Sequence, residues 1–369
     1  MKFGKNLKIL SFLLFVALVV TSCGEDEPIT YEIPTTYDFE NVNYNGQIQR
    51  LAMLKEMSDY MKTANATGNS ISADRLKAMF ENDAVIANFI QTYDDSKQLK
   101  SKTFESEQAV FEEIFDLFET ASQNNTSPAT VGTAGIQVSL DGTKAYFVNE
   151  NGVEFTQIIE KGLMGACFYY QATAVYMGEN KMNVDNTTVE AGEGTAMEHH
   201  WDEAFGYLGV PTDFPSNTDG LAWWGTYVNR RNALLNTNEI MTEFIKGRAA
   251  ISNNDLAARD EAIIGVQAKW ELASAGTVVN YLNTALDNFN DDAIRNHALS
   301  EAAGFAYALK FNPNKKVTNA NVDEILTKIG GSPVFKDMNF YNTTENDLND
   351  AKNLIAGYFN EIEAVKDEL

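Results

Sequence analysis

Apolar residues recur every three or four positions along most of the chain, the spacing of amphipathic α-helices. In the first clear example, residues 47–62, the apolar stripe consists of Ile48, Leu51, Leu54, Met57 and Met61. The polar residues that we expect off this stripe are Arg50, Lys55, Glu56 and Asp59. The same spacing returns at 76–80, 111–118 and 348–362. Because such helices bury their stripes by bundling, the pattern predicts an all-α fold.

One stretch departs from this pattern. Residues 136–155 show short apolar alternation on both sides of Asp141-Gly142, and Asn151-Gly152 follows. Both dipeptides favour tight turns with positive φ. We therefore expect a small β-hairpin that decorates the helical body.

Two strings of residues resemble each other. MEHHWDEAFGYLG (197–209) follows an apolar, small-residue segment at 157–178, and HALSEAAGF (297–305) follows a similar segment at 262–286. His199 and His297 are 98 positions apart (297 − 199 = 98), and the offset holds for the glutamate four residues later. This similarity at a constant offset predicts an internal repeat. With Pro- and Gly-containing breaks at 210–220 and 311–316, it predicts two fused, duplication-related helical bundles at 46–215 and 216–369.

The strings contain the candidate chemistry. On a helix, residues three or four apart share a face, so each histidine lies beside a glutamate. Imidazole and carboxylate suit iron, zinc, copper or manganese. The candidate metal ligands are His199, His200, Glu203, His297 and Glu301, with Asp202 as a supporting residue. If the two halves are related by a pseudo-twofold axis, these side chains share one pocket. In the alternative, each His–Glu pair only holds two helices in register.

The N-terminal end has the features of an export signal. Lys2, Lys5 and Lys8 precede the apolar run 9–20, which is too short to span a bilayer permanently. V-T-S-C (20–23) resembles the lipobox of bacterial lipoproteins, and the acidic tract at 24–27 resembles the surface-export signal of Bacteroidota lipoproteins. The resemblance implies a signal peptide at 1–22, lipidation of Cys23, a flexible tether at 23–45 and an outer-membrane, surface-exposed location.

Charge and motif content exclude several classes of protein. The net charge of −24 opposes binding to nucleic acid. Apart from Cys23, the sequence has only Cys167, so no disulfide framework is expected. It contains no H-E-x-x-H, G-x-S-x-G or phosphate-loop motif. The sequence therefore favours a binding protein over an enzyme.

The stretch from His200 to Glu203 matches H-x-x-E, the core motif of the imelysin-like family of bacterial envelope proteins. Nearly all of the mature chain resembles an uncharacterised family of Bacteroidota lipoproteins that we place beside the imelysins. The resemblance implies two four-helix bundles related by duplication, and a metal ion or haem-related ligand bound in iron or metal acquisition. The chain departs from the motif, because Glu198 occupies the position of an imelysin glycine. The motif selects His200, whereas the internal repeat selects His199.

A second cluster lies in LAWWGTYVNRRN (221–232). Trp223, Trp224, Arg230 and Arg231 are residue types favoured at interfaces, and the same residues also suit a helical core with a charged rim. They support an alternative function, in which the chain is a surface scaffold that binds an outer-membrane protein partner and both histidine strings are structural.

Overall fold

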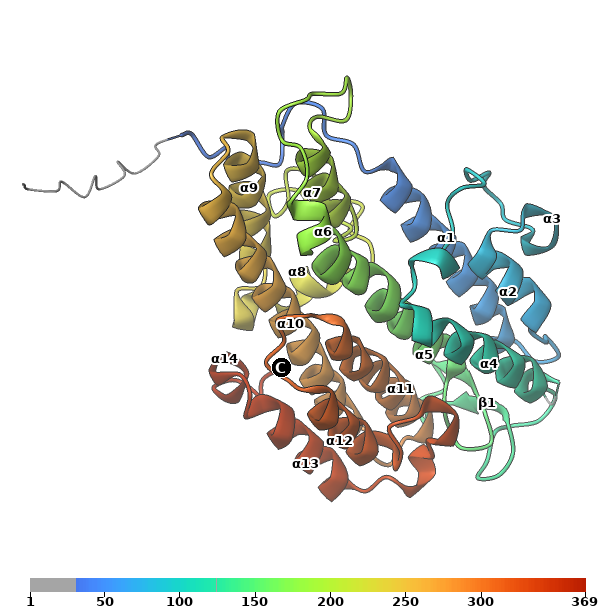
Figure 1. Cartoon of the computed structure of the whole chain (residues 1–369). Helices are drawn as coiled ribbons and strands as arrows, with labels where there is room; N and C mark the ends of the chain where they lie inside the picture. Colours follow the sequence, from blue (N-terminus) through green and yellow to red (C-terminus); the bar gives the residue numbers. More distant parts are fainter. Residues whose placement is uncertain (1–30, 124) are drawn as a thin grey trace, which may run out of the picture. The chain divides into compact units, whose positions relative to one another are not determined.

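A computed structural model describes residues 31–123 and 125–369, and α-helices dominate this part of the chain (Figure 1). The first helices are α1 (Asn45–Lys62), α2 (Ala73–Glu81), α3 (Ala84–Ala87) and α4 (Glu105–Ser122). The middle helices are α5 (Phe155–Leu163), α6 (Glu179–Met182), α7 (Ala196–Gly206), α8 (Trp224–Leu235) and α9 (Glu239–Ser252). The last are α10 (Leu256–Asp287), α11 (Asp292–Ala308), α12 (Asn319–Gly330), α13 (Glu345–Ala356) and α14 (Asn360–Glu363). The predicted all-α class is confirmed.

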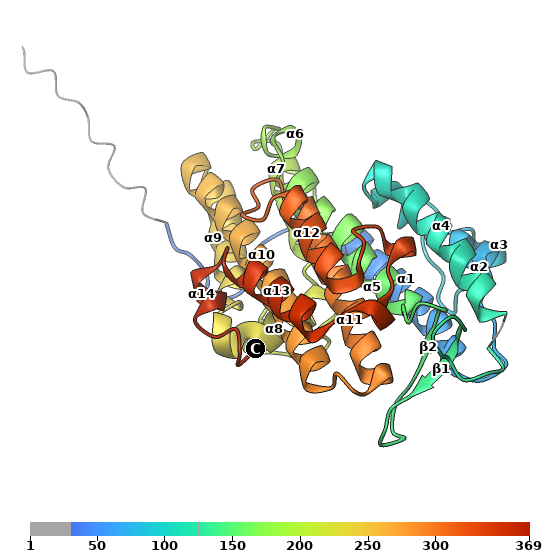
Figure 2. The same cartoon turned by 90° about the horizontal axis from the view of Figure 1, so that it is seen from below.

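The longest of these helices, α10, forms the centre of the body. It packs against α8, α9, α11 and α13, and α11 packs in turn against α5 and α12 (Figures 1 and 2). Small residues allow these close approaches. A Cβ added at Gly276 of α10 would lie 2.3 Å from Leu235 Cδ1 of α8. None of the helices within the described ranges has the length and apolar character that crossing a bilayer requires.

The helical segment expected at 157–178 changes its geometry along its length. After α5 the backbone widens into the π-helical turns η3 (Met164–Tyr169) and η4 (Gln171–Tyr176). At Gly165 the backbone lies against α11, where an added Cβ would meet Ala308 Cα at 2.6 Å. π-Helical turns are rare and are frequently found at functional sites. Tyr176, the last residue of η4, lies in the candidate functional site.

The predicted hairpin is confirmed. Strand β1 (Gly135–Val138) pairs antiparallel with β2 (Ala145–Val148), and Ile136 lies opposite Phe147. Gly142 occupies the connecting turn with φ +72°, which glycine adopts without strain. Ile136 is partly buried and Phe147 fully buried against the helical body, whereas Val138 and Leu140 remain exposed.

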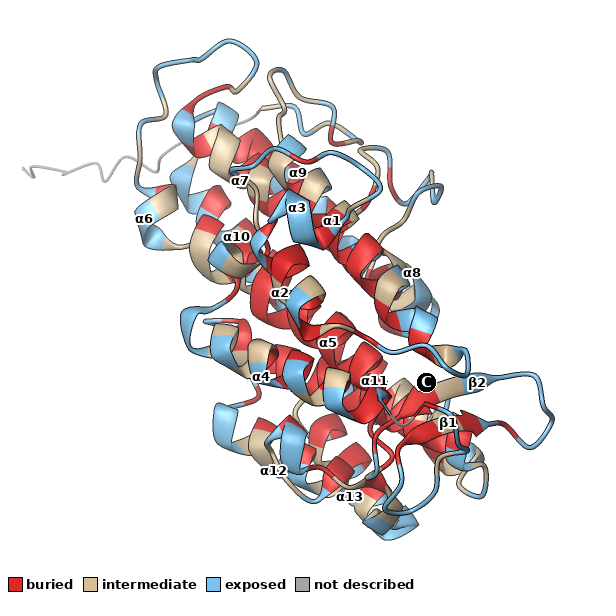
Figure 3. Cartoon of the chain, turned by 90° about the vertical axis from the view of Figure 1, so that its right-hand side faces the viewer, coloured by how far each residue is buried: buried red, intermediate tan, exposed pale blue. Residues whose placement is uncertain are grey.

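The packing of α1 differs from the expected single stripe. Arg50 and Glu56, expected off the stripe, are buried, and Ile48 of the stripe is 51% exposed. The polar side chains are buried because the loop after α3 covers them. Arg50 donates to the carbonyl oxygen of Gln98, and Glu56 accepts from the backbone N–H of Ile90. In Figure 3, much of α1 is coloured as buried.

The segment before α1 also packs against the body. Tyr37 is fully buried, its ring stacks on Phe205 with centroids 3.8 Å apart, and its N–H donates to the carbonyl of Thr212. The prediction of a flexible tether at 23–45 therefore does not hold from Tyr37 onward, because the buried Tyr37 ring fixes this segment on the helical body. The predicted signal peptide and Cys23 lie outside the described residues.

The expected breaks agree with the structure. The break at 210–220 lies between α7 and α8, and 311–316 precedes α12. Residues 32–369 form one compact unit. The division near residue 215 and the duplication stay predictions.

Candidate functional site

Helix α7 positions the first histidine string. It begins with a capping box, in which Thr195 and Glu198 bond each other's backbone N–H. One turn later, His199 Nδ1 lies 2.7 Å from Glu193 Oε2, and its Nε2 lies 3.8 Å from Glu203 Oε2. His200 Nδ1 approaches the same Glu203 oxygen at 3.2 Å. Both imidazoles therefore converge on one carboxylate, as the helical spacing predicted.

Glu203 is also bonded from two other elements. Its Oε1 accepts hydrogen bonds from Tyr176 of η4 at 3.0 Å and from Gln47 of α1 at 3.1 Å. Burial alone would raise the pKa of Glu203. The hydrogen bonds from His200 and Gln47 outweigh burial and lower this pKa to about 2. Glu203 is thus an ionised carboxylate whose two oxygens already have donors.

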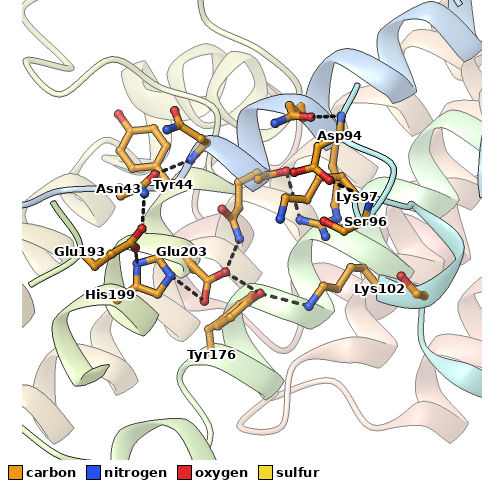
Figure 4. A pocket seen from close by; sticks show the side chains of 16 residues that line it. Asn43, Tyr44, Asp94, Ser96, Lys97, Lys102, Tyr176, Glu193, His199 and Glu203 are labelled. Carbon is orange, nitrogen blue, oxygen red and sulfur yellow. Dashed lines mark hydrogen bonds and ion pairs between the residues drawn. The ribbon is translucent and has the colours of Figure 1, made fainter. Parts of the chain in front are cut away.

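A polar pocket of about 630 Å³ opens beside this carboxylate, between α1, the loop 94–102 and α7 (Figure 4). Its negative and neutral lining includes Asn43, Tyr44, Gln47, Asp94, Glu193 and Glu203. Its basic lining consists of Arg50, Lys97, Lys102 and His199. In Figure 4 the side chains of Lys102, Tyr176 and Glu203 follow one another along one wall. We refer to this hollow as the polar pocket.

The three strong cations of the polar pocket form no close ion pair with any described residue, although the carboxylates of Asp94, Glu193 and Glu203 also line the pocket. Within the described part of the chain, no Asp or Glu oxygen lies within 4.0 Å of a charged nitrogen of Arg50, Lys97 or Lys102. Arg50 instead donates to two main-chain carbonyls, and Lys102 approaches the Tyr176 hydroxyl at 3.3 Å. Burial, and then repulsion by Arg50, lower the pKa of Lys102. The pocket therefore offers cationic donors that an anion can satisfy.

The second string, on α11, has a different environment. His297 Nδ1 contacts Glu154 Oε2 at 2.6 Å, its Nε2 contacts Glu301 Oε2 at 3.3 Å, and its ring stacks on Tyr146 of the hairpin. Burial alone would lower the pKa of His297, but the two carboxylates outweigh it and raise this pKa to about 10. His297 is therefore an imidazolium held between two glutamates.

A buried ion network continues from Glu301. Lys161 pairs with Glu301 and Glu160, and Glu160 also accepts from Lys62 at 3.0 Å. The Lys161 and Glu160 side chains are about 4% and 5% exposed, which leaves little room for a ligand. This arrangement matches the structural reading of the second string, in which paired charges join α1, α5 and α11.

The two strings share a local design but not a site. In each, a histidine bridges its own i+4 glutamate and a second glutamate from elsewhere in the chain. The first string belongs to the polar pocket, and the second to the buried network behind the hairpin, so the expected common pocket is replaced by two clusters. Across residues 31–123 and 125–369, no group of three or more His, Cys, Asp or Glu side chains is arranged to hold a metal ion.

The other candidate residues are divided between core and surface. Asp202 faces away from the histidines and accepts from Tyr37 at 2.6 Å and from Arg248 at 3.0 Å. Trp224 is fully buried and donates to the Met164 carbonyl, whereas Trp223 is half-buried and donates to the Leu51 carbonyl.

The two arginines are also separated. The exposed Arg230 guanidinium lies 5.5 Å from the Tyr227 ring centroid. Arg231 is half-buried beside Gly276. The predicted aromatic patch therefore consists of Trp223 and Arg230 on an accessible groove, with Trp224 in the core.

Sequence reasoning missed Arg50, Lys97, Lys102 and Tyr176. These residues come from α1, the loop 94–102 and η4, and no short motif joins them. One signal was available for Arg50, since a charged residue next to an apolar stripe can be buried when another segment covers the helix.

The fold and the polar pocket define a class: an all-helical protein with a hydrophilic cavity of a size suited to a small molecule. The chain belongs to the family described as Domain of unknown function (DUF4856), whose model matches residues 34–360. No curated protein and no solved structure matches the chain. The expectation of an uncharacterised family is confirmed, and the link to the imelysin-like family stays a prediction.

Proposed function

We propose that this protein is an envelope lipoprotein that binds a small, hydroxyl-rich anion in the polar pocket. One observation carries the proposal: three cations line a single pocket without a carboxylate oxygen of any described residue within 4.0 Å, in a chain whose net charge is −24. Where acids outnumber bases, most lysines and arginines find a carboxylate. Cations that lack a close carboxylate can instead form charge-assisted hydrogen bonds with a ligand anion.

The two sides of the pocket suit different parts of one ligand. Arg50, Lys97 and Lys102 provide N–H donors for a carboxylate or phosphate. The amides of Asn43 and Gln47 and the imidazole of His199 also line the pocket, and these groups, which now contact Glu193 and Glu203, suit hydroxyl groups. A volume of about 630 Å³ is in the range of small-molecule sites. A sugar acid or a sugar phosphate combines these features.

The location is proposed from the N-terminal sequence. The lysines before the apolar run 9–20 and the V-T-S-C string support export and lipidation at Cys23. A lipid anchor would hold the polar pocket at the membrane surface, where a binding protein can capture a solute.

Thermal unfolding in the presence of three probes tests the proposal. Because a ligand that binds only the folded state raises Tm, we expect glucuronate and glucose 6-phosphate to raise it and glucose to have little effect. The double variant Lys97→Gln/Lys102→Gln should lose the response, and Lys328→Gln, a change at a partly exposed lysine of α12 that pairs with Asp350, should keep it. No response to either anion, or an unchanged response in the double variant, would favour the alternative of a scaffold without a small ligand.

A metal ion at the first string is the second candidate function. The observation in its favour is that His199 Nε2 and His200 Nδ1 both face Glu203 Oε2. His199, His200 and Glu203 would hold the ion after Glu203 releases one of its present donors. Metal analysis after purification without a His tag tests this candidate. It predicts about one equivalent of Fe, Zn or Cu that His200→Ala/Glu203→Ala removes, and an equal background in both proteins excludes it.

A further inference from the structure

A second hollow lies between α1 and α8 and is separate in chemistry from the polar pocket. Its volume is about 810 Å³. Helix α1 contributes Ile48, Leu51, Ala52, Lys55 and Lys62, and α8 with its preceding residue contributes Trp223, Thr226 and Arg230. These positions follow helical spacing, so the groove runs along one face of each helix. Val210, Pro211, Leu221 and Ala222 form its floor.

The groove is apolar at one end and cationic at the other. At the apolar end the Trp223 indole N–H donates to the Leu51 carbonyl, so that α8 begins close to Leu51. At the other end, Arg230 lies 5.5 Å from the Tyr227 ring, and the Lys161 ammonium lies 5.1 Å from the same ring. Lys161 pairs with Glu160, which binds Lys62. This chain of contacts places Arg230 and Lys62 near the same end of the groove.

Arg230 is the cation that remains for a ligand. Lys55 pairs with Asp59 and Lys62 with Glu160, whereas the Arg230 guanidinium has no carboxylate within 4.0 Å in the described part of the chain. Asp219 is the one acidic residue among those that line the groove. An anion is therefore the complementary head group.

The backbone at Trp223 adds a second sign of function. Trp223 has φ +48° and ψ −115°, a conformation that costs energy for a residue with a large side chain. The indole bond to Leu51 and the packing of its ring in the groove hold it there. Strained residues of this kind concentrate at ligand sites.

We propose that this groove binds an anionic amphiphile with a single acyl chain, such as a fatty acid. The chain lies along Ile48, Leu51, Leu221 and Trp223, and the carboxylate pairs with Arg230. The volume of about 810 Å³ is in the range of small-molecule sites, which suits a small amphiphile.

Isothermal titration of the full chain with dodecanoate, below its micellar concentration, tests the proposal. Dodecyltrimethylammonium has the same acyl length and the opposite charge, and we expect it to bind at least about tenfold more weakly. Arg230→Gln should weaken dodecanoate binding about fivefold, relative to Lys328→Gln as control. Ile48→Asp should nearly abolish it, relative to Ile86→Asp, since Ile86 is equally 51% exposed but lies on α3.

Tryptophan fluorescence gives an independent readout. The chain has four tryptophans, and Trp201, Trp224 and Trp270 are fully buried, so a change on dodecanoate binding reports Trp223 and should disappear in Trp223→Phe. The proposal is overturned if dodecanoate does not bind, if the cationic amphiphile binds equally well, or if Ile48→Asp binds like Ile86→Asp. Because all variants share the full chain, binding elsewhere is common to every comparison.

Discussion

The same two residue types, histidine and glutamate, have different roles in the two histidine strings. Glu203 is ionised at the edge of an open pocket, and its partners come from η4, α1 and α7. Glu301 has a similar i,i+4 histidine but is buried, and Lys161 neutralises it. The surroundings therefore determine whether a His–Glu pair borders a ligand site or stabilises the core. Helical spacing predicted both pairs, whereas their partners from distant segments could not be inferred from the sequence.

The second pair makes folding stability depend on pH. The pKa of His297 is about 10 in the folded chain, and an unfolded histidine titrates near 6.5. The raised value means that the stabilisation is complete below the unfolded pKa and is lost as the pH rises towards 10. We expect His297→Gln to cost on the order of 3 kcal/mol near neutral pH, because two buried carboxylates lose their partner.

Urea unfolding of wild type and His297→Gln at about pH 6 and about pH 10 measures this difference. The gap in unfolding free energy should narrow at the higher pH. His199→Gln, the equivalent change in the other string, controls for the loss of an imidazole as such. A gap that stays constant or widens with pH would contradict the assignment of His297 as an imidazolium held between two glutamates.

At the scale of elements, two glycines within the strings, one after each His–Glu pair, allow close helix contacts. A Cβ at Gly206 of α7 would lie 2.7 Å from Tyr44 Cβ and 2.9 Å from Gln47 Cβ, and one at Gly304 of α11 would lie 2.4 Å from Lys161 Cβ. The sequence showed the apolar, small-residue segments that precede the two strings. It also predicted the hairpin and the helical breaks. It missed the π-helical turns, because periodicity does not distinguish a π turn from an α turn.

Gly206→Ala tests the contact between α7 and α1. Alanine normally favours a helix over glycine, but here its methyl group would overlap Tyr44 and Gln47, so we expect a loss of about 1–3 kcal/mol. Gly357→Ala at the end of α13 is the matched control, since its Cβ would have only ordinary contacts, from 3.4 Å. Denaturant unfolding compares them, and an equal effect of the two changes would show that the α7–α1 contact is loose.

At the scale of the whole molecule, charge is unevenly distributed. The chain has 52 acidic and 28 basic residues, yet three cations without a close carboxylate among the described residues border one pocket. Net charge could be calculated from the sequence, and the expectation that the chain does not bind nucleic acid rests on it alone. The position of the unpaired cations depends on how α1, the loop 94–102 and η4 meet, which only the folded chain shows. The shared metal pocket was expected from the repeat and is replaced by two separate clusters.

Anchoring is a second property of the whole molecule. If Cys23 carries acyl chains, Cys23→Ala should move the protein from the membrane fraction to the soluble fraction, because several chains together are needed for stable attachment. Fractionation followed by mass spectrometry of the N-terminal peptide measures both location and lipid mass. A wild-type protein that carries no lipid on Cys23 would contradict the anchor.

The most direct test of the central claim is the affinity of the polar pocket for glucuronate, measured by isothermal titration. We predict that wild type and Lys328→Gln bind one equivalent and that Lys97→Gln/Lys102→Gln binds at least about tenfold more weakly, since two charged donors are lost. Affinity should also fall at high pH, because the pKa of Lys102 is lowered and the deprotonated amine no longer attracts an anion. Equal affinity in the double variant, or equal binding of glucose, would contradict the account.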